Sequence, residues 1–178
     1  MVSKVKHTRE QRKRGFTLIE LLVVIFMIGV LSAIAAPGWL RFLSRHQVMS
    51  AQDELHQGIQ RAQQKSQQES ISWQLSIRED ADFVEYATHP SSTSPSFSAW
   101  KPLGDTVVLD GETNFASSGN VSYVQFDEKG NVRYRLGRVT LSSKRFPDIK
   151  HCVIVSTLIG NSRLAQERDV QVDNKFCY

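Results

Sequence analysis

Only two cysteines, Cys152 and Cys177, occur among the 178 residues of this chain. Two cysteines are too few for a disulfide-rich miniprotein or for a four-cysteine zinc site. The sequence also lacks a His-Glu-x-x-His, nucleophile-elbow, Walker or dinucleotide-binding motif, and its five histidines follow no catalytic or metal-ligand pattern. We therefore expect a protein that is not an enzyme, holds no metal and needs no cofactor.

Most of the chain has no excess of positive charge, although the formal net charge is +4. The chain has 22 basic and 18 acidic side chains. Six of the basic and one of the acidic side chains lie in residues 1–15, so residues 16–178 carry 16 basic and 17 acidic side chains. This distribution excludes a strongly basic globular domain, and the basic leader needs an explanation of its own.

Charge is also absent from Leu21 to Leu40. A helix of this length spans about 30 Å, the thickness of a bilayer core. The basic residues ahead of it predict that residues 1–14 stay in the cytoplasm and that the C-terminal part is exported. An ordinary secretory signal has its cleavage site after the apolar stretch, whereas here the composition changes before it, between Gly15 and Phe16.

One acidic residue, Glu20, lies a single turn inside the apolar helix, where a lone carboxylate costs at least ~2.5 kcal/mol. Cleavage after Gly15 would create an amine on Phe16, four residues from Glu20 and on the same helix face. That amine can pair with Glu20 within one chain or between neighbouring subunits. The alternative is an ordinary signal anchor with an incidental acid near the membrane surface.

The segment Lys13–Ile25, KRGFTLIELLVVI, resembles the class III signal of type IV prepilins and type II secretion pseudopilins. This resemblance implies cleavage between Gly15 and Phe16 by a prepilin peptidase/methyltransferase and N-methylation of Phe16. It also implies that Glu20 docks the subunit against other pilins or pseudopilins in a growing filament. Residues 1–15 would then be a leader that is removed.

Helical periodicity continues beyond the apolar run. Five apolar residues share one helix face: Val48, Ala51, Leu55, Ile59 and Ala62. We expect one helix over residues 16–70, transmembrane at 16–38 and amphipathic at 39–70. Pro37 and Gly38 match the family's helix-weakening position, and because proline removes a helix hydrogen bond they predict a bend or melting there. Gln63, Gln64, Gln67 and Gln68 are expected to form a solvated face.

Residues 71–178 have strand-like periodicity. Ile71–Ile77 alternates apolar and polar residues, Phe83–Tyr86 is its expected hairpin partner, and Thr88–Ser98 is expected to be a loop. Further strands are predicted at Thr106–Leu109, Ser122–Phe126, Val132–Leu136, Val139–Leu141, Val153–Thr157 and Arg163–Gln166, with turns at Asp127–Asn131 and Ile159–Ser162. The expected fold class is α+β: a pilin fold, with the long N-terminal helix packed on a small antiparallel β-sheet domain.

Three stretches of this half, Phe126–Val132, Val139–Leu141 and Cys152–Ser156, resemble the β domain of GspH/FimT-type minor pseudopilins. The two resemblances together imply a minor pilin or pseudopilin, anchored in the inner membrane by a single span with a cytoplasmic N-terminus. Such a subunit is assembled into a type IV pilus or a type II secretion pseudopilus and acts in pilus function or protein secretion. Of the Gly-Arg-x-Arg-like run that often ends the last hairpin in this subfamily, only Arg163 is in place.

The alternative function is a pilus-tip receptor for DNA uptake, with nucleic acid as the partner. Such a receptor needs exposed cations for phosphate contacts. Six basic residues could supply a patch: Arg133, Arg135, Arg138, Lys144, Arg145 and Lys150. A membrane-tethered enzyme is a third interpretation, with no motif in its favour.

Cys152 and Cys177 are expected to form a disulfide, because export leads to an oxidising compartment. Closing a loop of this size stabilises a protein by ~3.5 kcal/mol in the chain-entropy view, and it would hold the tail from Asp169 to Tyr178 on the sheet. Two unpaired thiols are the competing interpretation. A metal site at these cysteines would lack a suitably spaced histidine.

Overall fold

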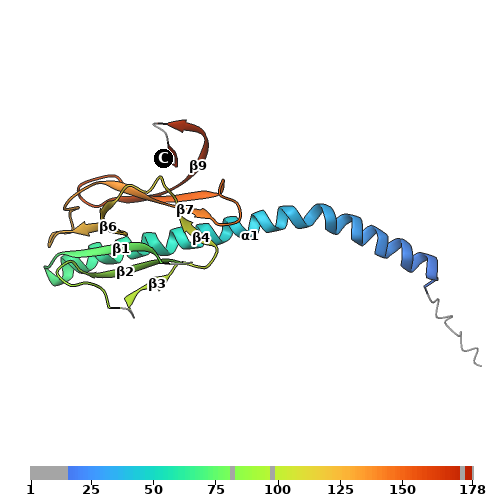
Figure 1. The fold of residues 1–178 in the computed structure, drawn as a ribbon, viewed down its shortest axis with the longest axis horizontal. Coiled ribbons are helices and arrows are strands. Elements are labelled where there is room, and N and C mark those ends of the chain that lie inside the picture. Colours follow the sequence, from blue (N-terminus) through green and yellow to red (C-terminus); the bar gives the residue numbers. More distant parts are fainter. Residues whose placement is uncertain (1–15, 81–82, 97–98, 173–174, 178) are drawn as a thin grey trace, which may run out of the picture. The chain divides into compact units, whose positions relative to one another are not determined.

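A computed structural model describes residues 16–80, 83–96, 99–172 and 175–177 (Figure 1). The chain divides into two compact units, one ending at Trp39 and one beginning at Leu40. A single long helix, α1 (Leu18–Glu69), contributes to both, and all the described strands belong to the second unit. The predicted long N-terminal helix is therefore confirmed, with ends within two residues of those expected.

In the first unit, α1 is apolar on all sides and its side chains are exposed. The helix is long and apolar enough to cross a bilayer, and none of its most apolar stretch is buried. The backbone stays helical through Pro37 and Gly38, so the predicted melting does not occur. A bend at these residues stays a prediction.

The described residues of the second unit form two antiparallel sheets of five strands each. The first sheet has the order β3-β2-β1-β6-β5: β3 (Lys101–Pro102), β2 (Phe83–Pro90), β1 (Trp73–Asp80), β6 (Val121–Phe126) and β5 (Ala116–Ser118). The second has the order β10-β9-β8-β7-β4: β10 (Lys175–Cys177), β9 (Ser162–Val172), β8 (Lys150–Val155), β7 (Gly137–Ser143) and β4 (Val107–Leu109). The α+β class is confirmed.

One hydrophobic core joins the second half of α1 to both sheets. The five apolar residues of the predicted helix face are all buried within it. Leu75 and Ile77 reach this core from the first sheet, and Val139 and Val153 reach it from the second. Every described core residue lies beyond Leu40, so the second unit has a complete core without the membrane helix.

The predicted hairpin is confirmed, because β1 and β2 pair along their length from Trp73 opposite Pro90 to Asp80 opposite Phe83. The predicted loop at Thr88–Ser98 begins three residues too early, since β2 continues to Pro90. His89 is buried there and bonds to β1, which a run of polar residues did not suggest. Proline suits the last position of the strand, because it cannot donate a ladder hydrogen bond.

The predicted strand at Val132–Leu136 is wrong. Only Val132 forms a bridge, to Phe126, and its N–H donates to the carbonyl of Leu158 in the turn after β8. The segment therefore crosses from the first sheet toward the second instead of extending a ladder. β3, β5 and β10 were missed, since strands of two or three residues are too short to display a period.

The prediction of a solvated glutamine face is wrong for Gln63, which is half-buried, and Gln67, although exposed, also bonds to another part of the chain. Gln63 Nε2 donates to the carbonyls of Gly130 (3.0 Å) and Ile159 (2.8 Å), and Gln67 Nε2 donates to Lys129 (3.2 Å). The end of α1 thereby holds two turns that belong to different sheets. Gln64 and Gln68 are exposed, as expected.

Both of these turns require glycine. Gly130 and Gly160 have φ angles of +82° and +79°, a region that other residues rarely adopt. A Cβ on Gly130 would lie 2.2 Å from Gln67 Nε2, and a Cβ on Gly160 would lie 2.4 Å from Gln63 Nε2. The glycines thus permit both the turn and the approach of the helix. The predicted turn at Asp127–Asn131 is confirmed, and the one predicted at Ile159–Ser162 lies two residues earlier, because β9 begins at Ser162.

Candidate functional site

The N-terminus of α1 begins immediately after the predicted processing junction. Gly15 lies outside the described residues, and Phe16 is 80% exposed. Thr17 caps the helix: its Oγ1 accepts a hydrogen bond from the Glu20 N–H (3.2 Å), and its carbonyl accepts one from the Leu21 N–H (3.1 Å). Thr-Leu-Ile-Glu is also the residue pattern of a capping box, a signal that our sequence reasoning overlooked.

The Glu20 carboxylate is available for a partner. It makes no ion pair within the part of the chain that the structure describes, and it lies in the first turn, where the helix dipole favours an anion. The cap uses the backbone N–H of Glu20 and the hydroxyl of Thr17, and does not use the carboxylate. The two side chains therefore have separable roles: Thr17 caps the start of the helix, and Glu20 provides a negative charge that can pair with a cation.

The disulfide between Cys152 and Cys177 is confirmed, with a Cα–Cα distance of 6.2 Å and both residues fully buried. It excludes the interpretations with free thiols or a cysteine-bound metal. The bond ties β10 to β8, so the C-terminal strand is held on the second sheet as expected. Among the described residues, no group of three or more His, Cys, Asp or Glu residues is arranged to hold a metal ion.

Polar contacts fix the same C-terminal strand. The Glu112 carboxylate accepts hydrogen bonds from the N–H groups of Phe176 (3.2 Å) and Cys177 (3.3 Å). Lys150 Nζ lies 3.1 Å from Asp110 and 3.3 Å from Glu112. Burial opposes the charge on Lys150, but the two carboxylates outweigh it and raise its pKa. This lysine is thus engaged inside the domain.

The six candidate DNA-binding residues do not form one patch. Arg138 lies near the start of β7 and donates to the carbonyl of Cys177, whereas Lys144 and Arg145 follow the other end of that strand. At ~3.3 Å per residue, these two groups are about 20 Å apart. Lys150 is paired with Asp110 and Glu112, and Arg133 donates to Ser72 Oγ (3.2 Å). The cationic surface that the alternative function requires is therefore dispersed.

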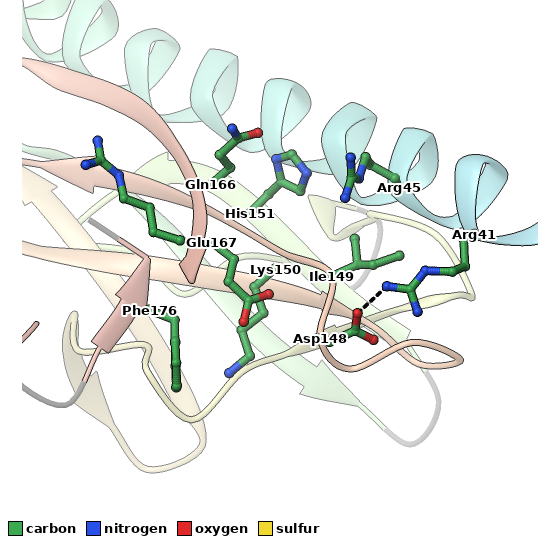
Figure 2. A pocket seen from close by; sticks show the side chains of 10 residues that line it. Arg41, Arg45, Asp148, Ile149, Lys150, His151, Gln166, Glu167 and Phe176 are labelled. Atoms are coloured by element: carbon green, nitrogen blue, oxygen red, sulfur yellow. Dashed lines mark hydrogen bonds and ion pairs between the residues drawn. The ribbon is translucent and has the colours of Figure 1, made fainter. Parts of the chain in front are cut away.

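Other charged side chains gather in a pocket of about 400 Å³ where α1 passes β8 and β9 (Figure 2). Arg41 and Arg45 point into it from α1, just beyond the apolar run that ends at Leu40. Arg41 pairs with Asp148, and its guanidinium carbon also lies 5.2 Å from the centre of the Phe146 ring. The pocket thus combines charges of both signs and is partly closed by an internal ion pair.

His151 stands at the inner end of this pocket and contacts Gln52, a buried residue of α1. The Gln52 amide nitrogen donates to the carbonyls of Cys152 (2.7 Å) and Ala165 (2.8 Å), and its oxygen accepts from His151 Nδ1 (3.1 Å). Burial, and then the charge of Arg45, lower the pKa of His151. No sequence pattern singled out Gln52, because a glutamine on an amphipathic helix is usually solvated.

Comparison with known proteins finds similarity in the N-terminal segment of this chain. Residues 11–36 match the prokaryotic N-terminal methylation motif. The chain is 48% identical over 44 residues to the type IV major pilin protein PilA of Myxococcus xanthus, which is 25% of this chain and 20% of that protein. It is 46% identical over 46 residues to the type IV major alpha-pilin of Moraxella bovis, 26% of this chain and 29% of that protein.

A third relative, the fimbrial protein EcpC of Eikenella corrodens, is 48% identical over 42 residues, 24% of this chain and 28% of that protein. The chain thus spans between a fifth and three tenths of the length of these curated relatives. No solved structure gives a significant match. The chain therefore has an N-terminal methylation motif and an N-terminal segment similar to those of type IV pilins, ahead of an apolar helix that continues into a pilin-like α+β architecture.

Proposed function

We propose that this protein is a minor pilin or pseudopilin. It is held in the inner membrane by one span, with residues 1–14 in the cytoplasm and the second unit outside. A prepilin peptidase cleaves it between Gly15 and Phe16 and methylates Phe16, and the subunit is then assembled into a type IV pilus or a type II secretion pseudopilus. Its role is structural and not catalytic.

The exposed apolar surface of the first unit is the observation that carries this proposal. The large hydrophobic side chains from Phe16 to Ile34 are 44–82% exposed. A continuous apolar surface of this kind needs lipid or another protein around it. Glu20 is the one acid on this surface, and it is open to a cation. The arrangement suits storage in a bilayer followed by packing against the helices of other subunits.

The second unit supports a specialised subunit rather than the bulk component of a filament. The sequence similarity to the named major pilins covers only about a quarter of this chain, so most of this sequence lies outside the matched region. Two sheets joined to one helix, with a disulfide-tethered terminal strand, form a stable body that can face outward from the filament. Its surface can then contact neighbouring subunits or exported substrates.

A pair of neighbouring substitutions tests the proposal. Glu20→Ala removes the carboxylate but keeps the Thr17 cap, because the cap uses the backbone N–H of residue 20. Thr17→Ala removes the cap and keeps the carboxylate, at a cost to the helix start of about 1 kcal/mol. We expect Glu20→Ala to be cleaved and retained in the membrane but excluded from filaments, whereas Thr17→Ala is incorporated nearly as well as the parent.

Measurement uses cell fractionation, in which the membrane-bound and sheared-filament pools of each variant are compared by immunoblotting. Mass spectrometry of the parent should show an N-terminus at methylated Phe16, and Gly15→Val should retain the leader. Normal incorporation of Glu20→Ala would show that its carboxylate has no part in assembly. A mature N-terminus beyond Ala36 would contradict the whole proposal, because it would mean an ordinary secretory signal.

A further inference from the structure

An uncharged pocket of about 420 Å³ lies on the outer face of the first sheet, on strands β1, β2 and β6. Along β1, Leu75 and Ile77 face the core, so the alternate residues Gln74 and Ser76 face outward. The residue Ser91 and those that follow β2 line the other side of the pocket. Its volume falls in the usual range for small-ligand sites, ~300–1,000 Å³.

A hydrogen-bonded row of side chains forms the floor of this pocket. His89, Gln74 and Gln125 are cross-strand neighbours on β2, β1 and β6. His89 Nδ1 lies 2.9 Å from the Pro90 carbonyl, an acceptor, so this nitrogen carries the proton. His89 Nε2 then accepts from the Ser76 hydroxyl (3.0 Å) and from the Gln74 amide (3.3 Å). These hydrogen bonds therefore fix the orientation of the side chains that form the floor of the pocket.

One member of the row is left without a partner. Gln125 is 92% buried, with 8% of its surface exposed, and its side-chain amide makes no hydrogen bond within the described residues. Its amide atoms are not among the fully buried side-chain atoms that lack a partner, so they are open to the pocket and can bind water or a ligand there. Gln125 lines the pocket, so a ligand placed there can satisfy both the amide nitrogen and the amide oxygen.

Two aromatic rings flank the floor and are themselves held in place. The Arg78 guanidinium lies 4.2 Å from the centre of the Trp100 ring, and Arg78 is fixed by Glu85 (3.0 Å). Tyr123 packs edge-on against Tyr134, with ring centres 6.4 Å apart. Rigid aromatic surfaces beside convergent polar groups bind ligands that have both C–H faces and hydroxyl edges.

We propose that this pocket binds a neutral saccharide of one or two rings. Its lining residues are serines, threonine, glutamines, histidine and aromatics, with Pro95 and Val121, and among the described residues no lysine, arginine, aspartate or glutamate lines it. The nearby cation Arg78, which stacks on Trp100, is already paired with Asp80 and Glu85, so its charge is not left for a phosphate or a carboxylate ligand. Sugar hydroxyls both donate and accept, which matches amides and hydroxyls, and the ring C–H faces match Trp100 and Tyr123. The proposal goes beyond the filament role and does not depend on it.

The test uses the full processed chain in a zwitterionic detergent, since detergents with sugar headgroups would compete for the pocket. The probes are maltose, lactose, cellobiose and diacetylchitobiose, with glucuronate as a charged control. Binding is followed by tryptophan fluorescence and by saturation-transfer NMR of the sugar. Each disaccharide is also offered coupled to a carrier protein, which separates capture of a soluble sugar from multivalent attachment to a glycan surface.

We expect at least one neutral disaccharide to bind saturably and glucuronate to bind more weakly. Gln125→Leu should weaken binding by about tenfold or more, as loss of one good hydrogen-bonding partner predicts. Ser92→Phe, at an exposed lining position that does not disturb the fold, should block the pocket. The matched control Gln68→Leu, on the exposed end of α1, should bind like the parent.

Three results would overturn the proposal: no saturable binding of any of the four sugars, unchanged affinity in both Gln125→Leu and Ser92→Phe, or equal loss of affinity in Gln68→Leu. Glu20→Ala should bind sugar normally, because the assay needs no filament. Failure of the filament role and failure of the saccharide site are therefore distinguishable.

Discussion

Substitution of Gln52 by leucine tests how α1 is attached to the second sheet. Gln52 is 3% exposed and makes three hydrogen bonds, two to backbone carbonyls and one to His151. Leucine has a similar volume and cannot hydrogen-bond, so the carbonyl of the buried Cys152 and that of the half-buried Ala165 each lose a contact. Each buried group left without its partner costs about 1–3 kcal/mol.

The expected loss in the free energy of unfolding is about 3 kcal/mol, less than the sum of three separate penalties because the added apolar surface of leucine offsets part of it. The assay is equilibrium urea unfolding of the chain from Leu40 onward, which contains the whole described core. The matched control is Gln57→Leu, an exposed glutamine on the same helix, which should change stability by less than about 0.5 kcal/mol.

Near-native stability of Gln52→Leu would refute the reasoning, because it would mean that solvent or a small shift of β8 and β9 satisfies the carbonyls equally well. A loss of the same size in Gln57→Leu would refute it differently, by showing that any apolar residue on this helix lowers stability. A clear loss in the first variant alone would show that the buried glutamine anchors the helix.

Thr140→Val should leave stability unchanged or raise it by up to about 1 kcal/mol, because the Thr140 hydroxyl is fully buried and has no hydrogen-bond partner among the described residues; a loss above 1 kcal/mol in urea unfolding would contradict this. Acidification should destabilise the second unit. Burial and then Arg45 lower the pKa of His151, and burial lowers the pKa of His56 despite Asp53. Both histidines then bind protons more readily in the unfolded chain, so their contribution to stability is complete above about pH 6.5 and is lost as the pH falls through the lower folded-state values. His56→Gln with His151→Gln should flatten the slope of unfolding free energy between about pH 7 and 5.5, and a slope as steep as that of the parent would contradict the assignment.

Strong local patterns in this chain predicted its elements well. The uncharged run from Leu21 to Leu40 and the apolar face from Val48 to Ala62 predicted one long helix of two characters, because a 3.6-residue period persists over many turns. The alternation after Ile71 predicted the first hairpin. The disulfide was predicted from the number of cysteines and the expected export, and neither of these depends on knowing the tertiary structure.

Tertiary structure decided which glutamines bond to distant parts of the chain. Gln52, Gln63 and Gln67 have the same side chain as Gln64 and Gln68, and periodicity alone cannot separate the glutamines that meet a backbone carbonyl from those that meet water. Their partners lie about 60 to 110 residues away along the chain, in turns and strands whose positions depend on how two sheets share one helix.

The chemical character of the N-terminal segment was determined by the sequence itself, since its leader, junction, Glu20 and apolar helix are contiguous and need no folded partner to be recognised. The outer pocket was decided only by the fold. His89, Gln74 and Gln125 are scattered over some fifty residues, and antiparallel pairing alone places them in one row. Pairing register is a long-range property, because a shift of a single residue would turn each of these side chains toward the core.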